Sequence, residues 1–220
     1  VADRLVVLAG WLVTDGTIKR KKHAHADGTE TEYRYGRIVQ SKPATVEILK
    51  NLGLSFYVGK LKDTNFHANY APHTFSIPVS EYKELESLGV VDGKLSWEFL
   101  SRLTERQLRL LADTMMLGDG TGQNRFCGEE SEIFWMTLIN VLLGKPVTFY
   151  EQKQEGQRCW RTRHVSARTI SCHRKEIKPY SGGIWCPSVD TGFWVTQQNG
   201  VVFITGNTIS AWNVAGGQLL

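Results

Sequence analysis

The chain has 220 residues, 41% of them hydrophobic and 22% charged, which is ordinary for a globular protein with one large or two modest cores. Its four cysteines form no C-x-x-C pair and no zinc-ligand spacing, so we expect reduced thiols in a cytoplasmic setting, with neither a disulfide framework nor a structural zinc site. No apolar stretch is long enough for a membrane span, the N-terminus lacks a signal-peptide layout, and the net charge of +4 permits a nucleic-acid partner without requiring one.

The first predicted element is an apolar helix that ends in Asp15-Gly16. Apolar residues surround nearly its whole circumference: Val6, Leu8, Ala9, Leu12 and Val13. This pattern is typical of a helix buried between two halves of a protein, and the small Ala9 and Gly10 would let a partner helix approach closely. We expect Gly16 to end the helix in the left-handed conformation and to expose Asp15. The helix begins almost at the first residue, without a cap, so we expect the chain to be a piece of a longer protein.

A basic β-hairpin is predicted next, with strands at 17–25 and 33–40 and Asp27-Gly28 as its turn. The rest of the first half is predicted in this order: a helix from 42 to 52 closed by Gly53, strands at 55–62 and 65–79, a helix from Ser80 as its cap to Leu88, and a connecting helix at 95–103.

The second half begins with Thr104 as the cap of a helix that ends in Asp119-Gly120. The elements predicted after it are a short hairpin at 121–128, a helix from 131 to 143 ended by Gly144 and Pro146, a hairpin at 147–154 and 158–170, and a C-terminal hairpin with Asn199-Gly200 as its turn.

The two Asp-Gly ends are 119 − 15 = 104 residues apart, which indicates two copies of one unit. Two such helices side by side would bring both carboxylates to one point, where a divalent cation could be shared. For a single copy, a simple turn after a core helix is an equally good explanation. The pair resembles the LAGLIDADG homing endonucleases with two motifs on one chain. The first copy keeps Leu8, Ala9, Gly10, Asp15 and Gly16 of that pattern, whereas the second keeps Asp119-Gly120 but has Ala112, Asp113 and Thr114 where Leu, Ala and Gly are expected.

This resemblance implies an α+β fold, in which two αββαββα repeats form a saddle of two antiparallel sheets. The endonuclease domain would span 1–170, with repeats at 1–90 and 104–170. By resemblance, Asp15 and Asp119 are catalytic and, with Gly16 and Gly120, hold Mg²⁺ for a double-strand cut in a long specific DNA site, by a monomer. A nearby lysine, Lys60 or Lys62, would steady the charge of the reacting phosphate.

Basic residues on strands of both halves suit double-stranded DNA, because Lys and Arg neutralise phosphates and a two-stranded ribbon reaches base edges. The predicted DNA-binding residues are Lys19, Lys21, Arg34, Arg37, Lys60, Lys62, Arg161 and Arg163. The alternative is a solvated sheet face, which a charge run such as 19–22 favours when taken alone. His23 and His25 lack a third ligand and are interpreted as surface residues.

The C-terminal segment resembles the end of an intein of the class with a Trp-Cys-Thr signature, which implies β-strands of a Hint splicing domain at 171–207 and host-protein sequence at 208–220. Its splicing residues would be Cys186, Thr205, Asn207 and Thr208, whose thiol, hydroxyl and amide groups suit acyl transfer and Asn cyclisation. The Trp would lie in an N-terminal intein half that this chain lacks. The usual His before the terminal Asn is replaced by Gly206, and assistance by His173 or by the missing half is left open. A weak resemblance of the last residues to phage terminase suggests a phage origin.

Two alternative functions remain from the sequence. One is a DNA-binding module that has lost cleavage, because the second motif and its first hairpin depart from the pattern. The other is a free-standing endonuclease without splicing, against which the Asn207-Thr208 end argues.

Overall fold

The computed structural model describes residues 1–59, 71–121, 125–145, 147–154, 157–164, 179, 181–182, 189–198 and 201–206. The first half consists of α1 (Asp3–Thr14), β1 (Gly16–Ala24), β2 (Glu30–Gln40), α2 (Pro43–Asn51), β3 (Ser55–Val58), β4 (His73–Ser76) and α3 (Val79–Ser87). After the short α4 (Trp97–Ser101), the second half has α5 (Glu105–Asp119), β5 (Gly120–Thr121), β6 (Arg125–Gly128), α6 (Glu130–Leu142), β7 (Val147–Gln154) and β8 (Gln157–His164). A last hairpin consists of β9 (Phe193–Gln198) and β10 (Val201–Gly206). The predicted order of helices and hairpins in the first repeat is confirmed.

Local signals in the sequence set most helix boundaries. Thr104 and Gln107 form a reciprocal capping box at the start of α5, which confirms the predicted cap. Gly53 and Gly144 follow α2 and α6 with φ of +65° and +68°, the left-handed conformation that ends a helix. The prediction for Ser80 is wrong: α3 already begins at Val79, after Pro78, whose fixed φ turns the chain into the helix.

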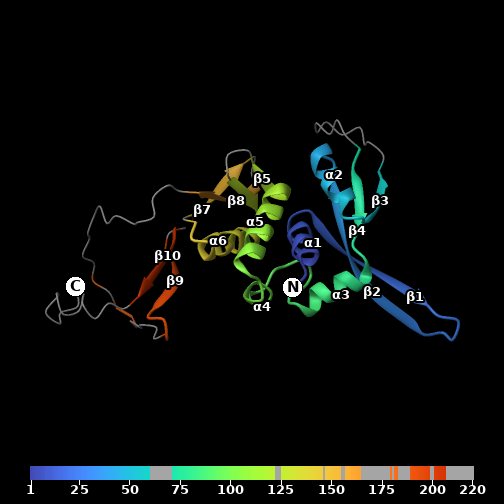
Figure 1. Cartoon of the computed structure of the whole chain (residues 1–220), viewed down its shortest axis with the longest axis horizontal. Helices are drawn as coiled ribbons and strands as arrows, with labels where there is room; N and C mark the ends of the chain where they lie inside the picture. Colours follow the sequence, from blue (N-terminus) through green and yellow to red (C-terminus); the bar gives the residue numbers. More distant parts are fainter. Residues whose placement is uncertain are drawn as a thin grey trace.

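Two antiparallel sheets flank the central helices α1 and α5 (Figure 1). The first has the strand order β1-β2-β4-β3, and the second has the order β5-β6-β8-β7-β10-β9. The hairpin β9–β10 joins the second sheet through one ladder position, Val201 opposite Thr148. Its predicted assignment to a separate splicing domain, and the other domain boundaries, stay predictions.

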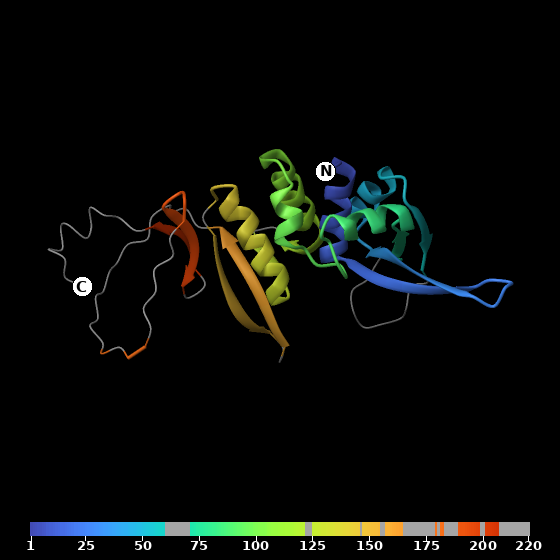
Figure 2. The same ribbon diagram turned by 90° about the horizontal axis from the view of Figure 1, so that it is seen from below.

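The helices cover one side of the two sheets, and the long hairpin β1–β2 extends beyond them (Figure 2). Side chains of both halves form one apolar core, which includes Trp11, Tyr82, Phe99, Phe126 and Ile133. Every residue of α1 from Leu8 to Val13 is buried, as its apolar circumference predicts. None of the helices in the described part of the chain has the length and apolar character needed to cross a bilayer.

The contact between α1 and α5 is built from two complementary pairs at positions 104 residues apart. A Cβ atom on Gly10 would lie 2.8 Å from Thr114 Cγ2, and one on Gly118 would lie 2.7 Å from Thr14 Cβ. Each threonine hydroxyl donates to a carbonyl one turn back in its own helix: Thr14 to Gly10 O at 3.1 Å, and Thr114 to Leu110 O at 2.8 Å. Each helix therefore has a glycine that accommodates a threonine of the other helix. Thr114 stands where the motif has glycine, and the two helices still approach closely there because Gly10 faces it.

Candidate functional site

The candidate site lies where α1 and α5 end. Both helices pass directly into a strand, and the glycine after each aspartate has the same steric role. A Cβ on Gly16 would overlap the Leu12 carbonyl, and a Cβ on Gly120 would overlap the Met116 carbonyl. The predicted left-handed conformation of Gly16 is wrong, because it is absent from the positive-φ glycines of the described residues. Glycine is required here by the close approach of the backbone to the preceding helical turn.

The packing of the two helices brings Asp15 and Asp119 together. A Cβ on Gly118, the residue before Asp119, would lie 2.9 Å from Asp15 Oδ2. Both carboxylates are half-buried. Burial, followed by the charge of Asp15, raises the pKa of Asp119 from 3.8 to about 6, whereas Lys42 acts in the opposite direction. Burial also raises the pKa of Asp15, against the lowering effects of its hydrogen bond from Gln40 and of Lys42.

Two residues that the sequence analysis missed complete this cluster. Gln40 Nε2 donates to Asp15 Oδ2 at 2.7 Å, and Lys42 Nζ donates to the carbonyl of Gly118 at 3.2 Å. Gln40 is buried at the end of β2, in the same alternation as the core residue Ile38. The sequence did contain a signal for Gln40, which is a polar residue at a position of β2 that faces the core. A buried polar group needs a hydrogen-bonding partner, so this position predicts one.

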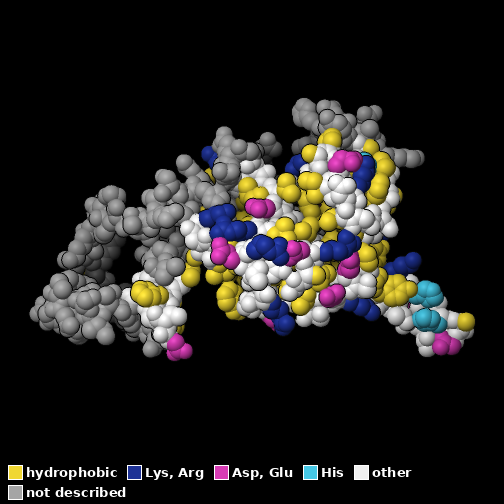
Figure 3. All heavy atoms as spheres, in the orientation of Figure 1, with side chains coloured by type: hydrophobic (Ala, Val, Ile, Leu, Met, Phe, Trp, Pro, Cys, Tyr) yellow, Lys and Arg dark blue, Asp and Glu magenta, His cyan; other side chains and the backbone are white. Residues whose placement is uncertain are grey.

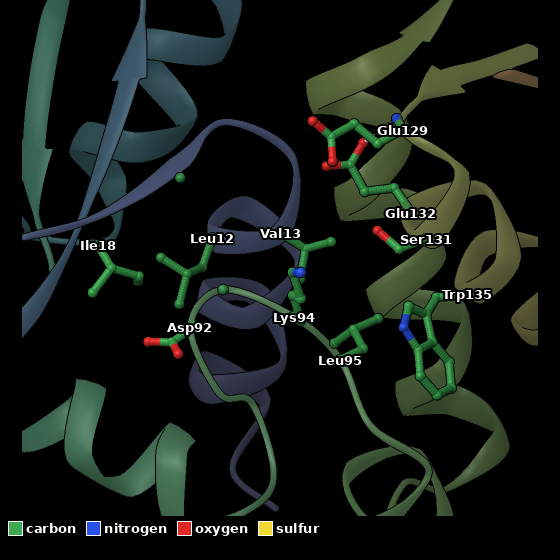
Figure 4. A pocket seen from close by; sticks show the side chains of 12 residues that line it. Leu12, Val13, Ile18, Asp92, Lys94, Leu95, Glu129, Ser131, Glu132 and Trp135 are labelled. Atoms are coloured by element: carbon green, nitrogen blue, oxygen red, sulfur yellow. Dashed lines mark hydrogen bonds between the residues drawn. The ribbon is translucent and has the colours of Figure 1, made fainter. Parts of the chain in front are cut away.

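Two further carboxylates stand beside the pair, at the start of α6. Burial is the main cause that raises the pKa of Glu132 to about 7, and the charges of Asp119, Glu129 and Asp15 add to it. Glu129 and Glu132 lie next to each other at one end of a cleft of about 150 Å³ (Figure 4). The same cleft is lined by Gly16 and by Lys94.

The arrangement fits a divalent cation held by two protein carboxylates. Within the described residues, no group of three or more His, Cys, Asp or Glu side chains is arranged to hold a metal ion. Mg²⁺ is commonly bound through one or two carboxylates, with water and substrate phosphate as the other ligands. Asp119 has no hydrogen-bonding partner among the described residues, so its oxygens are available to such an ion.

The hairpin β1–β2 has one face that is basic and free of acidic residues. Register places Lys19 opposite Tyr35, Lys21 opposite Tyr33 and Thr17 opposite Arg37, so these side chains share a face. We call Lys19, Lys21, Tyr33, Tyr35 and Arg37 the basic face. The opposite face carries the ion pairs Arg20–Glu32 and Lys22–Glu30. Around the core of the molecule, Lys and Arg lie among Asp and Glu, whereas imidazoles mark the tip of the hairpin (Figure 3).

Arg34 does not belong to the basic face. It lies on the opposite side of the hairpin, where its guanidinium is 3.1 Å from both Glu86 and Asp92. Its position is explained by these ion pairs, and its predicted contact with DNA stays a prediction.

Several predicted site residues cannot be placed. Lys60, Lys62, Cys186, Asn207 and Thr208 lie outside the described residues. In β8, Arg161 is paired with Cys127 and Tyr150, and Arg163 with Arg125 and Thr148. Thr205, half-buried in β10, is paired with Trp194.

The sequence matches no protein-family model and no curated protein. Several solved structures have a similar chain path, and three of them are compared with this chain by sequence identity, coverage and TM-score. The homing endonuclease I-DmoI in complex with DNA and Mn is 12% identical, with 74% of this chain and 89% of that chain covered and a TM-score of 0.44. The complex of I-DmoI with DNA and Ca is also 12% identical, with 74% and 83% covered and a TM-score of 0.45. The meganuclease I-SmaMI bound to uncleaveable DNA is 11% identical, with 73% and 78% covered and a TM-score of 0.38. These values are low, and the assignment of a function therefore rests on the geometry of the site.

Proposed function

We propose that this protein is a divalent-cation-dependent endonuclease of the LAGLIDADG homing type, which cuts both strands of a long double-stranded DNA site. The observation that carries the proposal is the meeting of Asp15 and Asp119 at the ends of two packed helices. The two carboxylates repel each other, and burial weakens their hydration, so the folded protein gains from a cation between them.

The chemistry follows from the residues around the pair. Mg²⁺, when held by Asp15 and Asp119, supplies Lewis-acid polarisation of a phosphate oxygen and a lowered pKa of water. Gln40 fixes the orientation of the Asp15 carboxylate through its hydrogen bond. The Lys42 ammonium is placed to stabilise negative charge on a scissile phosphate, a role that the sequence analysis gave to Lys60 or Lys62. The basic face of β1–β2 neutralises phosphates along the duplex.

The test uses DNA recovered by binding. A pool of randomised duplexes is selected for binding to the Asp15→Asn variant, and the recovered duplex is then offered to the wild-type protein with Mg²⁺. We expect cleavage by the wild type and a loss of at least about a thousandfold in the variant, because a cation ligand contributes several kcal/mol to the reaction. DNA binding should differ little between the two proteins. Equal binding with no cleavage by the wild type would favour the alternative module that only binds DNA.

The splicing function is a separate proposal, supported by the sequence pattern at the C-terminal end. We propose that 171–207 is the C-terminal part of an intein and that splicing requires an N-terminal half supplied in trans. The hairpin β9–β10 ends at Gly206, directly before the proposed scissile Asn207-Thr208 bond. With the missing half, the Cys186→Ala variant should fail in the first acyl transfer, and Asn207→Ala should accumulate a branched intermediate on Thr208. Ligated products of the Cys186→Ala variant in a mass spectrum would refute the assigned nucleophile.

The monomeric state, phage origin and cytoplasmic location are proposed on the sequence alone.

A further inference from the structure

The two halves of the site differ at equivalent positions of their first hairpins. The motif glycines align them: Gly16 is paired with Ile38 and Gly120 with Phe126. Two residues further along each strand stand Gln40 and Gly128. Gln40 donates to Asp15, whereas Gly128 has no side chain, and a Cβ there would lie 3.4 Å from the carboxyl carbon of Glu132. An amide donor in the first half is thus replaced by a carboxylate in the second.

The helices that follow these hairpins begin with opposite charge. Lys42 directly precedes α2, and Glu129 directly precedes α6. The next three residues are uncharged at the start of α2, whereas two of three are glutamates at the start of α6. Lys42 reaches the backbone beside Asp119, and Glu129 and Glu132 line a cleft together with Gly16, beside Asp15 (Figure 4). Within the described side chains, one side of the carboxylate pair therefore carries an amide and a cation, and the other carries two carboxylates in a cleft that Lys94 also lines.

In the proposed function, each side of the carboxylate pair would face one of the two DNA strands. A cation beside a scissile phosphate stabilises the charge that develops during cleavage, and a carboxylate at the same place raises its energy. Resting on the proposed function, we infer that the protein cuts the two strands at unequal rates. The strand on the Gln40–Lys42 side is cut first, and a nicked duplex accumulates before the second cut on the Glu129–Glu132 side.

The experiment uses the full chain, Mg²⁺ and the duplex selected by binding, with a different fluorescent label on each strand. A supercoiled plasmid that carries this duplex reports the nicked and linear forms. We expect one strand to be cut about tenfold faster or more, which is a smaller effect than the roughly hundredfold loss caused by removing one charge-stabilising group from an active site. The plasmid should pass through a nicked form before it becomes linear.

Variants identify the side of the site that is responsible. The double variant Glu129→Gln/Glu132→Gln keeps side-chain oxygens that can accept the capping hydrogen bonds at the start of α6, and it should accelerate the slow strand about fivefold or more while changing the fast strand less than about twofold. Lys42→Met should slow the fast strand most. The matched control is Glu130→Gln, an exposed neighbour with the same change in charge, which should alter neither rate more than about twofold.

The outcomes separate the two ideas. Equal rates for both strands in the wild type would overturn this inference and leave the proposed nuclease intact. A slow strand that does not respond to the double variant, or responds equally to Glu130→Gln, would also overturn it. No cleavage of either strand would overturn the proposed function, and this inference with it.

Discussion

At the candidate site, two half-buried carboxylates face one amide donor and one ammonium group. The pKa of Asp119 is about 6 in the folded protein and 3.8 in its ordinary environment. A carboxyl whose folded pKa is raised destabilises the fold when it ionises. This destabilisation is absent below about pH 4 and is complete above about pH 6. Above about pH 6 the site therefore lowers the stability of the fold, and a bound cation would relieve this effect.

The Asp119→Asn variant should expose this cost. In metal-free buffer above about pH 7 the variant should unfold at a higher temperature than the wild type, because it lacks the buried charge. The difference should disappear as the pH falls below about 4, where Asp119 is protonated in both states. Calorimetry over this range measures it. The exposed Asp113→Asn is the control and should show no such dependence on pH.

The same pKa shifts predict how cleavage depends on pH. Protons compete with the cation for Asp119, whose pKa is raised to about 6, so cleavage at a fixed, subsaturating Mg²⁺ concentration should fall as the pH drops through about 6. Raising the Mg²⁺ concentration should move this midpoint to lower pH. If the pH midpoint of cleavage does not change with the Mg²⁺ concentration, the titrating group is one that does not bind the cation.

At the scale of elements, the α1–α5 contact depends on a glycine opposite a threonine. Gly10→Ala would place a methyl group against Thr114, inside contact distance. We expect the free energy of unfolding to fall by about 1–3 kcal/mol, the usual effect of overpacking. The double variant Gly10→Ala/Thr114→Gly moves the glycine to the other helix and should recover part of this loss. Urea denaturation measures both. Asp113→Ala, on the exposed side of α5, should change stability little.

The two faces of the β1–β2 hairpin should contribute differently to DNA binding. Lys19→Ala/Lys21→Ala removes two cations from the basic face, which is free of acids, and should reduce the slope of log K against log salt by about 1.8. Arg20→Ala/Lys22→Ala removes the same charge from the face where Glu32 and Glu30 already pair with it, so the slope should change less. Binding titrations at several salt concentrations give the slope for each double variant and for the wild type. Equal effects would mean that the hairpin attracts DNA only through its net charge.

Most elements could be predicted because their signals are local. Thr104 as a cap, Gly53 and Gly144 as helix ends, and Asp27-Gly28 as a hairpin turn each depend on a few neighbouring residues. The roles of Gln40 and Lys42 could not be predicted in the same way. They depend on the register of β2 against β1 and on the packing of α1 against α5, which join residues 25 and 76 positions apart. The pairing of β10 with β7 is equally long-range.

At the scale of the whole molecule, the two halves are tied at the start of the central helix pair. At the start of the helices, Arg106 binds Asp3 through two bonds of 2.7 Å, and Gln107 donates to Val1 O at 2.6 Å. The hydrogen bonds that Asp3 accepts from Arg106, the main cause, and from Gln107 lower its pKa to about 2. An ion pair thus holds α1 and α5 together where they begin, whereas the carboxylates of Asp15 and Asp119 repel each other where the two helices end.

A cation should therefore stabilise the whole protein and not only the site. Mg²⁺ should raise the unfolding temperature of the wild type above about pH 7, and at a free concentration of about one hundred times Kd the gain is about 2.7 kcal/mol. The Asp15→Asn/Asp119→Asn variant should show no gain under the same conditions. Differential scanning calorimetry with Mg²⁺, and with Na⁺ at matched ionic strength as the control, measures it. A gain of the same size in the variant would place the ion elsewhere.

The reciprocal glycine and threonine pairs also decide which surfaces can meet. Two copies of the first half, joined in the same way, would set Gly10 against Gly10 and leave a void, and would set Thr14 against Thr14 and overlap. Two copies of the second half would meet the same mismatch at Thr114 and Gly118. Each half is thus shaped for the other and poorly for itself. Neither half could form a symmetric pair through this helix contact without a change at its own glycine or threonine.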